Sequence, residues 1–595
     1  MLLPRWPALA LAVAALTGCS GRQASPPIAT PDPDPLPQGA VGVERVRAFA
    51  HPSCAAHAGV DAVRMPRPDP DTGDLRDDWL LVTAGSTGVY GALVDDAWTL
   101  RDEAFWPVPG QSLPWSDVRA ARLRDPAGRE RAYVYHVSQG SGDLQITDVT
   151  DFPLRTTVRW PIDLGLPVAV HGAHTLQIDA ARGVLVLNGV RATGSPLPPP
   201  LTEGCAPAAF FDVATDPMHP RLLSLFVGPD DGDQVLFDSQ FLEVDGQPLW
   251  AATIQQPQRG NASYFAFYDA SDPTAMATAA RVGVYLGPAS GAMHNVVALP
   301  PRPDGAPRLC AGFEAFAFGA GAGDVVGKAG VLDARDLLAG AAPQLVGWLV
   351  DDSNRLHAVH NPAARVRESA AHTFDAVPLA HFTAGYCLFR CDQDQGSVEL
   401  LARVPLSDVT PSADAGRFHP TMNVPTWPAV YNGAWDAVAT PIGDFVSSTD
   451  REASYLIEPT FGFVRRFGSY VPGPDGAVLR VVLRGPVPTV GDALQLEVQG
   501  AAPGVPVHLL VGTAVASPPV VRGAAGAIHV DPAGIVLELE QAPAGTAVAF
   551  ALPPVPGARQ LVLTAWQPGA GRGGAARRSP AGLVRLRSPT ARSTR

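Results

Sequence analysis

The sequence is short of positive charge. Its 44 Lys and Arg residues against 57 Asp and Glu residues give a formal net charge of -13. Binding to nucleic acid phosphates needs a clustered excess of Lys and Arg, so this balance argues against a general affinity for nucleic acid. The apolar run at residues 8–16 is too short to span a bilayer as a mature helix.

Familiar catalytic signatures are also missing. The sequence contains no G-x-S-x-G, no H-E-x-x-H, no Walker loop and no zinc-spaced C-x-x-C. Cysteine is scarce as well, with six residues in the whole chain. If Cys19 is set aside, an odd number remains, which cannot all pair within the chain, and we expect buried thiols at Cys54, Cys205, Cys310, Cys387 and Cys391.

Turn-forming residues, in contrast, are abundant. The chain of 595 residues holds 59 Gly and 61 Pro, which leaves little room for long helices. Its apolar fraction of 46% is enough for a packed interior. A chain of this length exceeds one ordinary hydrophobic core, so we expect an all-β protein with more than one domain.

The N-terminus has the pattern of an export signal. Arg5 precedes the apolar run, which ends in Leu16-Thr17-Gly18-Cys19. This tetrapeptide resembles the lipobox of bacterial lipoproteins, in which the Cys is acylated and becomes the new N-terminus. A plain secretory signal with an incidental Cys is the alternative. Ser20 follows the Cys in place of the Asp that resembles an inner-membrane retention signal, so the outer membrane or cell surface is the expected location.

An internal repeat follows a Pro-rich tether at residues 20–41. Each unit reads as four strands, and the third strand ends in an acid about every 60 residues, longer than the ~40 to 50 residues typical of propeller blades. Seven such units bury both faces of their sheets only by radial stacking, which predicts a seven-bladed β-propeller over residues 42–471. These acids are expected to accept backbone N–H bonds in the turns: Asp95, Asp148, Asp212, Asp269, Asp333, Asp392 and Glu458. Residues 42–50 (GVERVRAFA) are expected to join the last blade, whose outer strand is expected near residues 461–470.

Polar residues open the first strand of most units. Because the first strand of a blade is innermost, these residues are expected to form a ring at one mouth of the channel: Asp117, His174, Asp238, His294, His360 and Asp436, with Asp61 a looser seventh member. Two interpretations stay open. The ring is either a solvated set of inter-blade hydrogen-bond partners or a divalent metal site built from carboxylates and imidazoles. The first is favoured, because so wide a ring leaves few ligands within the ~2 Å that zinc requires.

The composition changes after the repeats. Alternating apolar and polar runs at residues 472–570, such as DALQLEVQG and QLVLTAW, predict a small β-sandwich of immunoglobulin-like size. Residues 571–595 carry several Arg among Gly, Ala and Ser and are expected to form a disordered basic tail. The signal and anchor Cys then occupy residues 1–19, before the tether.

The repeat carries a family resemblance. The segments LQITDVTDFP, FFDVATDPMHP and FAFYDASDP resemble LVIVD-type repeats, and the order of blade openings resembles that of bacterial choice-of-anchor B proteins. The resemblance covers residues 42–470 and implies an exported propeller attached to a surface, with no established reaction. Family members more often have His before the acid, where this chain has Phe237, and His-Gln where it has His294-Asn295. These departures weaken any shared metal site.

Two functions follow as hypotheses. The first is a lipid-anchored binding or interaction module with a surface protein or polysaccharide as partner and no cofactor. The second is a metal-assisted hydrolase or lyase that uses the His and Asp ring with a divalent metal. Neither hypothesis involves nucleic acid.

The lipobox yields a direct prediction. Cys19→Ala removes the thiol that would be acylated, so the variant protein is expected to leave the membrane fraction and appear in the soluble fraction. Fractionation followed by immunoblotting measures this, with Ser20→Ala as the matched control. Continued acylation of the Cys19 variant would show that the cleavage site is misplaced.

Overall fold

The computed structural model describes most of the chain after the tether. The described residues are 36–37, 40–68, 73–108, 116–193, 206–228, 235–256, 262–286, 292–299, 307–314, 328–349, 359–362, 374–381, 385–392, 398–406, 434–449, 451–459, 465–467, 469–470, 479–484, 493–512, 515–521, 527–530, 535–544, 547–553, 560–567, 577–578 and 581–585. Cys19 and most of the predicted tether lie outside them. Within these ranges no helix is long and apolar enough to cross a membrane.

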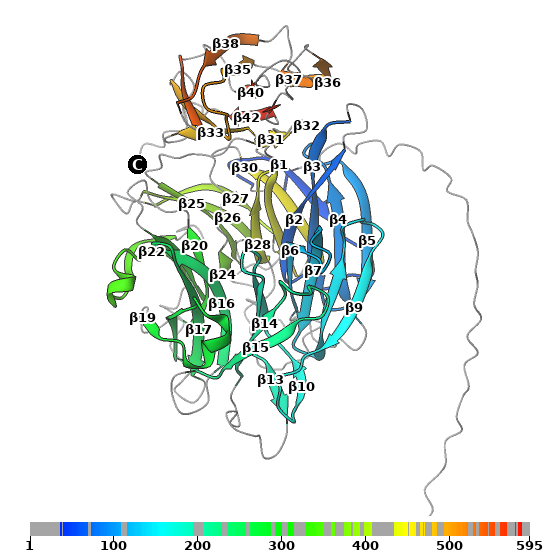
Figure 1. Ribbon diagram of the computed structural model, residues 1–595, viewed down its shortest axis with the longest axis vertical. Coiled ribbons are helices and arrows are strands. Elements are labelled where there is room, and N and C mark those ends of the chain that lie inside the picture. The colour runs from blue at the N-terminus through cyan, green and yellow to red at the C-terminus, as the bar shows by residue number, and fades with distance from the viewer. Residues whose placement is uncertain are drawn as a thin grey trace, which may run out of the picture. The chain divides into compact units, whose positions relative to one another are not determined.

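Seven antiparallel sheets follow one another along the chain (Figure 1). Each contains four strands in chain order, except that the last takes its fourth strand from the beginning of the chain; β32 (Ser469–Tyr470) adds a fifth strand to the first sheet. Blade 1 comprises β2 (Val60–Pro68), β3 (Leu75–Gly85), β4 (Gly88–Val94) and β5 (Leu100–Pro107). Blade 2 comprises β6 (Ser116–Arg124), β7 (Glu130–Ser138), β8 (Ser141–Asp148) and β9 (Thr156–Pro161). Blade 3 comprises β11 (Thr175–Asp179), β12 (Val184–Asn188), β14 (Ala208–Asp212) and β15 (Arg221–Phe226).

The next three blades repeat the pattern. Blade 4 comprises β16 (Val235–Val244), β17 (Gln247–Gln256), β18 (Ala262–Asp269) and β19 (Arg281–Tyr285). Blade 5 comprises β20 (Ala292–Leu299), β21 (Arg308–Glu314), β22 (Lys328–Asp333) and β23 (Gln344–Leu349). Blade 6 comprises β24 (Val359–Pro362), β25 (Phe374–His381), β26 (Gly385–Asp392) and β27 (Val398–Val404). Two 3₁₀ turns, η2 (Pro273–Thr278) and η3 (Leu337–Ala339), and the hairpin of β10 (Ala169–Gly172) with β13 (Arg191–Thr193) lie between these strands.

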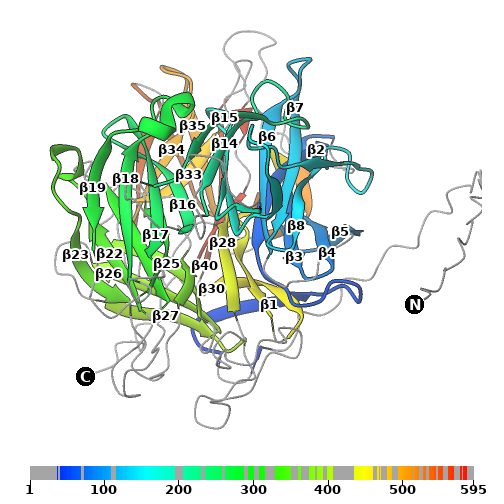
Figure 2. The ribbon, with the colours of Figure 1, turned by 90° about the horizontal axis from the view of Figure 1, so that it is seen from below.

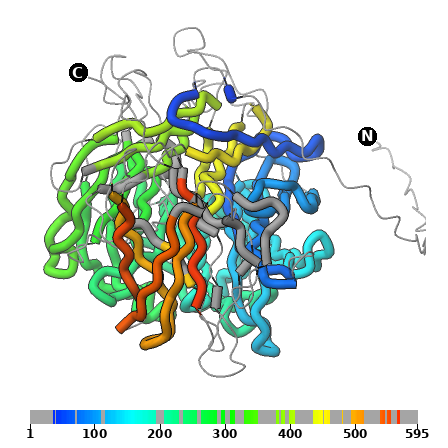
Figure 3. The backbone as a smooth tube through the Cα atoms, turned by 90° about the horizontal axis from the view of Figure 1, so that it is seen from above, coloured from blue at the N-terminus to red at the C-terminus, as the bar shows by residue number. Residues whose placement is uncertain are grey.

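Blade 7 closes the ring with a strand from the start of the chain. It contains β28 (Ala434–Thr440), β29 (Gly443–Ser448) and β30 (Ala453–Pro459), and β1 (Val43–Phe49) pairs antiparallel with β30. Figure 3 shows the blue β1 beside the yellow strands of this blade. The predicted latch at residues 42–50 is therefore confirmed. The expected outer strand at residues 461–470 is wrong, because β31 (Arg465–Phe467) pairs with β42 and β32 (Ser469–Tyr470) pairs with β3.

The seven sheets make a β-propeller. The first strands of successive blades contact one another in order, and β28 of blade 7 contacts β2 of blade 1, so the series is closed. Figure 2 shows the blades side by side around a centre. The third-strand acids cap turns as the sequence predicts: Asp212 Oδ1 accepts the Ala214 N–H at 2.9 Å, and Asp269 Oδ1 accepts the Ser271 N–H at 2.9 Å. The Ser271 hydroxyl and N–H hold the pKa of Asp269 below its ordinary value.

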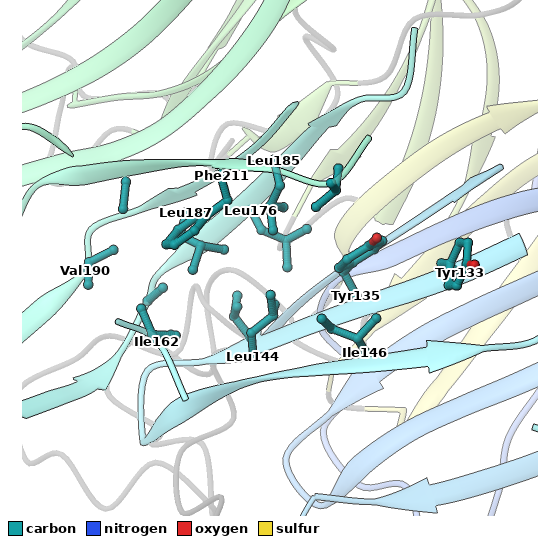
Figure 4. Packing of buried hydrophobic residues seen from close by; sticks show 14 of the residues in the cluster. Tyr133, Tyr135, Leu144, Ile146, Ile162, Leu176, Leu185, Leu187, Val190 and Phe211 are labelled. Atoms are coloured by element: carbon teal, nitrogen blue, oxygen red, sulfur yellow. The ribbon is translucent and has the colours of Figure 1, made fainter. Parts of the chain in front are cut away.

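Apolar side chains fill the spaces between neighbouring blades. Between blades 2 and 3, Tyr135, Leu144 and Ile146 pack against Leu187 and Phe211 in one fully buried cluster (Figure 4). The middle strands of these blades, such as β12 and β14, are buried on both faces, which is why the repeat reads as continuous apolar runs in place of strict alternation. The predicted buried thiols agree where they are described: Cys54, Cys310, Cys387 and Cys391 all lie in apolar clusters.

A second domain follows the propeller. Its larger sheet contains β31, β42 (Ala581–Arg585), β40 (Gln560–Gln567), β35 (Val507–Gly512) and β38 (Ile535–Gln541), with β41 (Arg577–Arg578) on β40. Its smaller sheets are β33 (Arg480–Arg484), β34 (Leu494–Gln499) and β39 (Ala547–Leu552), and the pair β36 (Val515–Val521) and β37 (Ala527–Val530).

The two main sheets share one core, which makes this domain a β-sandwich. Leu496 of β34 and Phe550 of β39 pack in the same buried cluster as Leu509 of β35 and Leu563 of β40. The predicted tail at residues 571–595 differs from the structure, because β41 and β42 lie within it and pair with β40. Hydrogen bonding of β42 to an existing strand explains this, since a short segment with Gly and Arg has no strand signal of its own.

Ring closure predicts a measurable role for β1. Val46 is 2% exposed and packs in the cluster between blades 6 and 7. Val46→Ala removes two buried carbons and is expected to lower the free energy of unfolding by about 2 kcal/mol. The midpoint of guanidinium chloride unfolding measures this. Glu44→Ala, at an exposed position of the same strand, should stay within about 0.5 kcal/mol of the wild type; equal effects would mean that β1 does not contribute through packing.

Candidate functional site: the propeller channel

The innermost strands line a partly open cavity of about 190 Å³. Six of its lining residues are polar and come from six different blade positions, and six are small or medium apolar residues. The polar residues are Asp61, Arg119, Gln177, Gln240, Asn295 and Asp436, and the apolar ones are Val60, Val297, Ala298, Ala437, Val438 and Ala439.

Two carboxylates of the predicted ring join neighbouring blades. Asp117 Oδ1 accepts the N–H of Val118 at 2.8 Å, and its Oδ2 accepts the N–H of Leu176 in the next blade at 2.9 Å. Asp436 repeats this arrangement, because its oxygens accept the N–H groups of Ala437 at 2.9 Å and of Val60 in blade 1 at 3.1 Å. These contacts support the inter-blade interpretation for Asp117 and Asp436.

The same pattern shows which residue of blade 1 takes this position. The residue before Val60 is Gly59, so Gly59 and not Asp61 corresponds to Asp117. A Cβ on Gly59 would lie 2.8 Å from Asp117 Oδ1, which leaves no room for a side chain. Asp61 lies two residues further along, level with Arg119, and its Oδ2 accepts the N–H of Ala120 at 2.8 Å. The sequence therefore placed Asp61 in the wrong layer of the channel.

β-Bulges shift the alignment in two other blades. The register of β16 shifts between Leu236 and Asp238, and that of β20 shifts between Met293 and Asn295. Phe237 and His294 are the extra residues, so Asn295 and not His294 corresponds to Asp238. The predicted equivalence of His174 and His294 with the acids is therefore wrong by one residue, because Thr175 and Asn295 take these positions in blades 3 and 5. Sequence comparison missed the shift because a bulge leaves no signal in so short a motif.

The histidines pack against an aromatic ring. The ring centroids of His174 and Phe237 lie 3.9 Å apart, and those of Phe237 and His294 lie 4.8 Å apart. Gln139 Nε2 contacts His174 Nδ1. His174 and His294 thus form a row with Phe237. The carboxyl groups of Asp117, Asp238 and Asp436 lie instead around the guanidinium of Arg119. His360 belongs to β24, but its side chain lies outside the described residues.

Arg119 is the group that the acids surround. Its Nη1 donates to Asp117 Oδ1 at 2.8 Å and to the Val118 carbonyl at 2.7 Å, and lies 3.6 Å from Asp436 Oδ2. Its Nε donates to Gln177 Oε1 at 3.3 Å. Arg119 was not predicted as a channel residue. It could have been found from its spacing, because a residue two positions after Asp117 on a strand points to the same face of the sheet.

Among the described residues, negative charge outweighs positive charge in the channel. Burial raises the pKa of Asp61 and of Asp117 to about 6, against the opposing attraction of Arg119. Burial and then the charge of Asp117 raise the pKa of Asp238 to about 7. Although burial opposes it, the charges of Asp117 and Asp436 raise the pKa of Arg119, which therefore stays charged. One guanidinium does not neutralise four carboxyl groups.

Asp238 is the least compensated of these acids. It is 1% exposed, and its Oδ1 accepts the Ser239 N–H at 2.7 Å and the Thr175 hydroxyl at 3.0 Å. Its Oδ2 has no hydrogen-bond partner. A buried carboxylate oxygen without a donor is costly, and it is the chemical feature of this channel that packing alone does not explain.

The groups at the cavity wall define what it can contact. Among the described residues, no three His, Cys, Asp or Glu side chains are grouped so that they could hold a metal ion. The described lining residues carry carboxylate, amide and guanidinium groups beside apolar side chains. The carboxylates, amides and guanidinium can hydrogen-bond a polar ligand.

A buried Ser–His pair lies elsewhere in blades 7 and 1. His57 Nδ1 lies 2.9 Å from Ser454 Oγ, and the Thr83 hydroxyl donates to the same oxygen at 2.9 Å. Both His57 and Ser454 are completely buried, and burial lowers the pKa of His57 to about 4. This pair therefore ties the segment before β2 to blade 7 and does not face a substrate.

Comparisons with known proteins do not assign a family. No family model and no curated protein matches the sequence. Solved structures with some similarity include Raptor of Chaetomium thermophilum (TM-score 0.37, 9% identity, 69% of this chain and 29% of that chain). Others are an alpha-L-arabinanase of Penicillium chrysogenum complexed with arabinobiose (TM-score 0.35, 13% identity, 59% and 95%) and the Dos1 propeller (TM-score 0.28, 10% identity, 64% and 79%). This chain spans about three tenths of the Raptor chain. At these TM-scores the similarities carry no argument about ligand or reaction.

The uncompensated charge predicts a pH-dependent stability. The pKa of Asp238 rises from 3.8 to about 7 on folding, so the folded chain favours the protonated carboxyl group. The resulting contribution to the free energy of unfolding is complete below about pH 4 and is lost as the pH rises through 7. Asp238→Asn keeps the Oδ1 acceptor and removes the charge. It is expected to raise the free energy of unfolding at pH 8 by a few kcal/mol, about 1.4 kcal/mol per pKa unit.

Thermal unfolding between pH 5 and 8 measures this gain, which should shrink as the pH falls. Asp269→Asn, the same change at a turn on the same blade, is the matched control and should not stabilise the chain. A destabilised Asp238→Asn variant at pH 8 would show that the carboxylate charge is compensated in the folded chain.

Proposed function

We propose that this chain is an exported β-propeller that binds a small polar ligand in its central channel and is held at the cell surface by a lipid on Cys19. The polar cavity of about 190 Å³ carries this proposal. Binding sites of this kind are concave and present a few convergent polar groups on a rigid scaffold. Here the scaffold is the ring of inner strands, which the Asp117 and Asp436 bonds tie together.

The channel groups support binding without turnover. Each oxygen of Asp61 accepts one backbone N–H, from Ala62 at 2.7 Å and from Ala120 at 2.8 Å, so this carboxylate is fixed by the scaffold. The alternative of a metal-assisted hydrolase or lyase has less support, because the described residues contain no group of three metal ligands.

Surface attachment rests on the sequence. The Leu16-Thr17-Gly18-Cys19 lipobox and the resemblance to choice-of-anchor B proteins with LVIVD-type repeats both support an exported protein with an acylated N-terminus. On this proposal the propeller is a binding or interaction module displayed on the outer membrane or cell surface, where a surface protein or polysaccharide is its partner.

A channel-filling variant tests the proposal. Ala298 and Ala439 both line the cavity and are half-buried, so Ala298→Leu with Ala439→Leu adds six carbons to a space on the order of six water molecules. The purified full-length chain is screened by thermal shift against small sugars, amino acids, amines and carboxylates. We expect compounds that stabilise the wild type and lose their effect in the filled variant.

The control is Ala48→Leu at an exposed position of β1, which should respond like the wild type. Hits that stabilise the filled variant equally, or the absence of any stabilising compound, would contradict a channel site. Mass spectrometry of the incubated compounds separates binding from turnover, because conversion of a hit would favour the enzymatic alternative.

A further inference from the structure

The charges of the channel describe the ligand that would fit it. Asp61 on β2, Asp117 on β6, Asp238 on β16 and Asp436 on β28 share one cation, Arg119 on β6. Arg119 is already engaged by Asp117 and Gln177. Four carboxyl groups and one guanidinium leave a negative field in a space with few water molecules, where charges interact more strongly than in bulk water.

The position of Asp238 strengthens this imbalance. Asp238 and Gln240 are two residues apart in a regular part of β16, opposite Thr253 and Ala251, so their side chains point to the same face. Gln240 lines the cavity, and that face is therefore the channel. The second carboxylate oxygen of Asp238 is buried without a partner, so its charge acts across the channel without neutralisation from its own blade.

We infer that the channel binds a small organic cation with a primary ammonium group, an inference that rests on the proposed function. The ammonium has three N–H donors, and each oxygen of the Asp61 carboxylate at the cavity wall accepts one backbone N–H and has a second lone pair. The Gln240 side chain lies at the same wall. The remaining volume suits a ligand of a few heavy atoms.

Other ligand classes match these groups less well. An anion would meet four carboxyl groups, and the one guanidinium that could receive it is already paired. A neutral sugar would leave the field of Asp238 unmatched. A directly coordinated metal ion requires a group of three ligands, which the described residues do not provide.

A series of nearly equal shape tests the charge of the ligand. Isothermal titration of the purified full-length chain at pH 8 compares ethanolamine, which is cationic, with ethylene glycol, which is neutral, and glycolate, which is anionic; calcium chloride is the fourth probe. We expect ethanolamine alone to bind, with its affinity falling at least tenfold between pH 8 and pH 5 as Asp61, Asp117 and Asp238 become protonated.

Variants locate the effect. Asp238→Asn should weaken ethanolamine binding about tenfold or more, because one unit charge in a poorly hydrated channel acts over several ångströms. Gln240→Leu should weaken it as well, while Asp269→Asn, the matched change outside the channel, should leave it unchanged. Unaltered binding in Asp238→Asn would overturn the inference even if ethanolamine binds.

The outcomes separate this inference from the proposed function. Binding of ethylene glycol or glycolate that the channel-filling variant abolishes would overturn the cationic ligand and leave a channel-binding protein. Calcium binding in place of ethanolamine would do the same in favour of a metal ion. Absence of binding by all four probes would overturn the inference, and the thermal-shift screen with the filled variant then decides the proposed function independently.

Discussion

The pairing of β1 with β30 is the constraint on which the rest of the structure depends. Seven sheets can bury both faces only if the last blade packs against the first, and a strand from the beginning of the chain supplies the outer edge of blade 7. The buried His57 and Ser454 pair reinforces the same junction. With the ring closed, the first strand of each blade has a fixed place at the centre, and its alternate side chains face the channel.

The channel serves two structural roles at two depths. At one level Asp117 and Asp436 bond the inner strand of their own blade to that of the next, which is a directional contact that depends on the carboxylate and not on its charge. Two residues further along, Asp61, Arg119, Gln177 and Gln240 line the cavity. The inter-blade hydrogen bonds of Asp117 and Asp436 hold neighbouring inner strands together, so the side chains that line the cavity are positioned before any ligand binds.

The excess of carboxyl groups is difficult to explain by stability alone. Asp238 uses only its Oδ1 to accept the Ser239 N–H and the Thr175 hydroxyl, so an Asn at this position would make the same two bonds without the cost of burying a charge. Retention of Asp238 with an oxygen lacking a donor is therefore a feature of chemistry more than of scaffolding. A cationic group in the channel would stabilise the ionised acids and lower the raised pKa values of Asp61, Asp117 and Asp238.

The sequence by itself determined the architecture. Seven acid-ended third strands, turns rich in Gly and Pro, and a spare strand at residues 42–50 were enough to predict a closed propeller followed by a sandwich, because these signals are local and repeat many times. It also placed Asp117, Asp238 and Asp436 at the channel. The strands β41 and β42 escaped prediction, since their support is pairing with β40 and, for β42, also with β31.

The tertiary structure alone decided the composition of the site. A bulge at His294 puts Asn295 in line with the acids, and in blade 3 that position belongs to Thr175 and not to His174. In blade 1 it belongs to Gly59, so Asp61 lies in the next layer of the channel. Arg119 had no motif of its own and became the centre of the charge cluster only when strands from blades 2, 3 and 7 met around it. Periodicity is a property of one strand at a time, whereas the balance of charge in a channel depends on the strands of several blades and on single-residue shifts that no local pattern reveals.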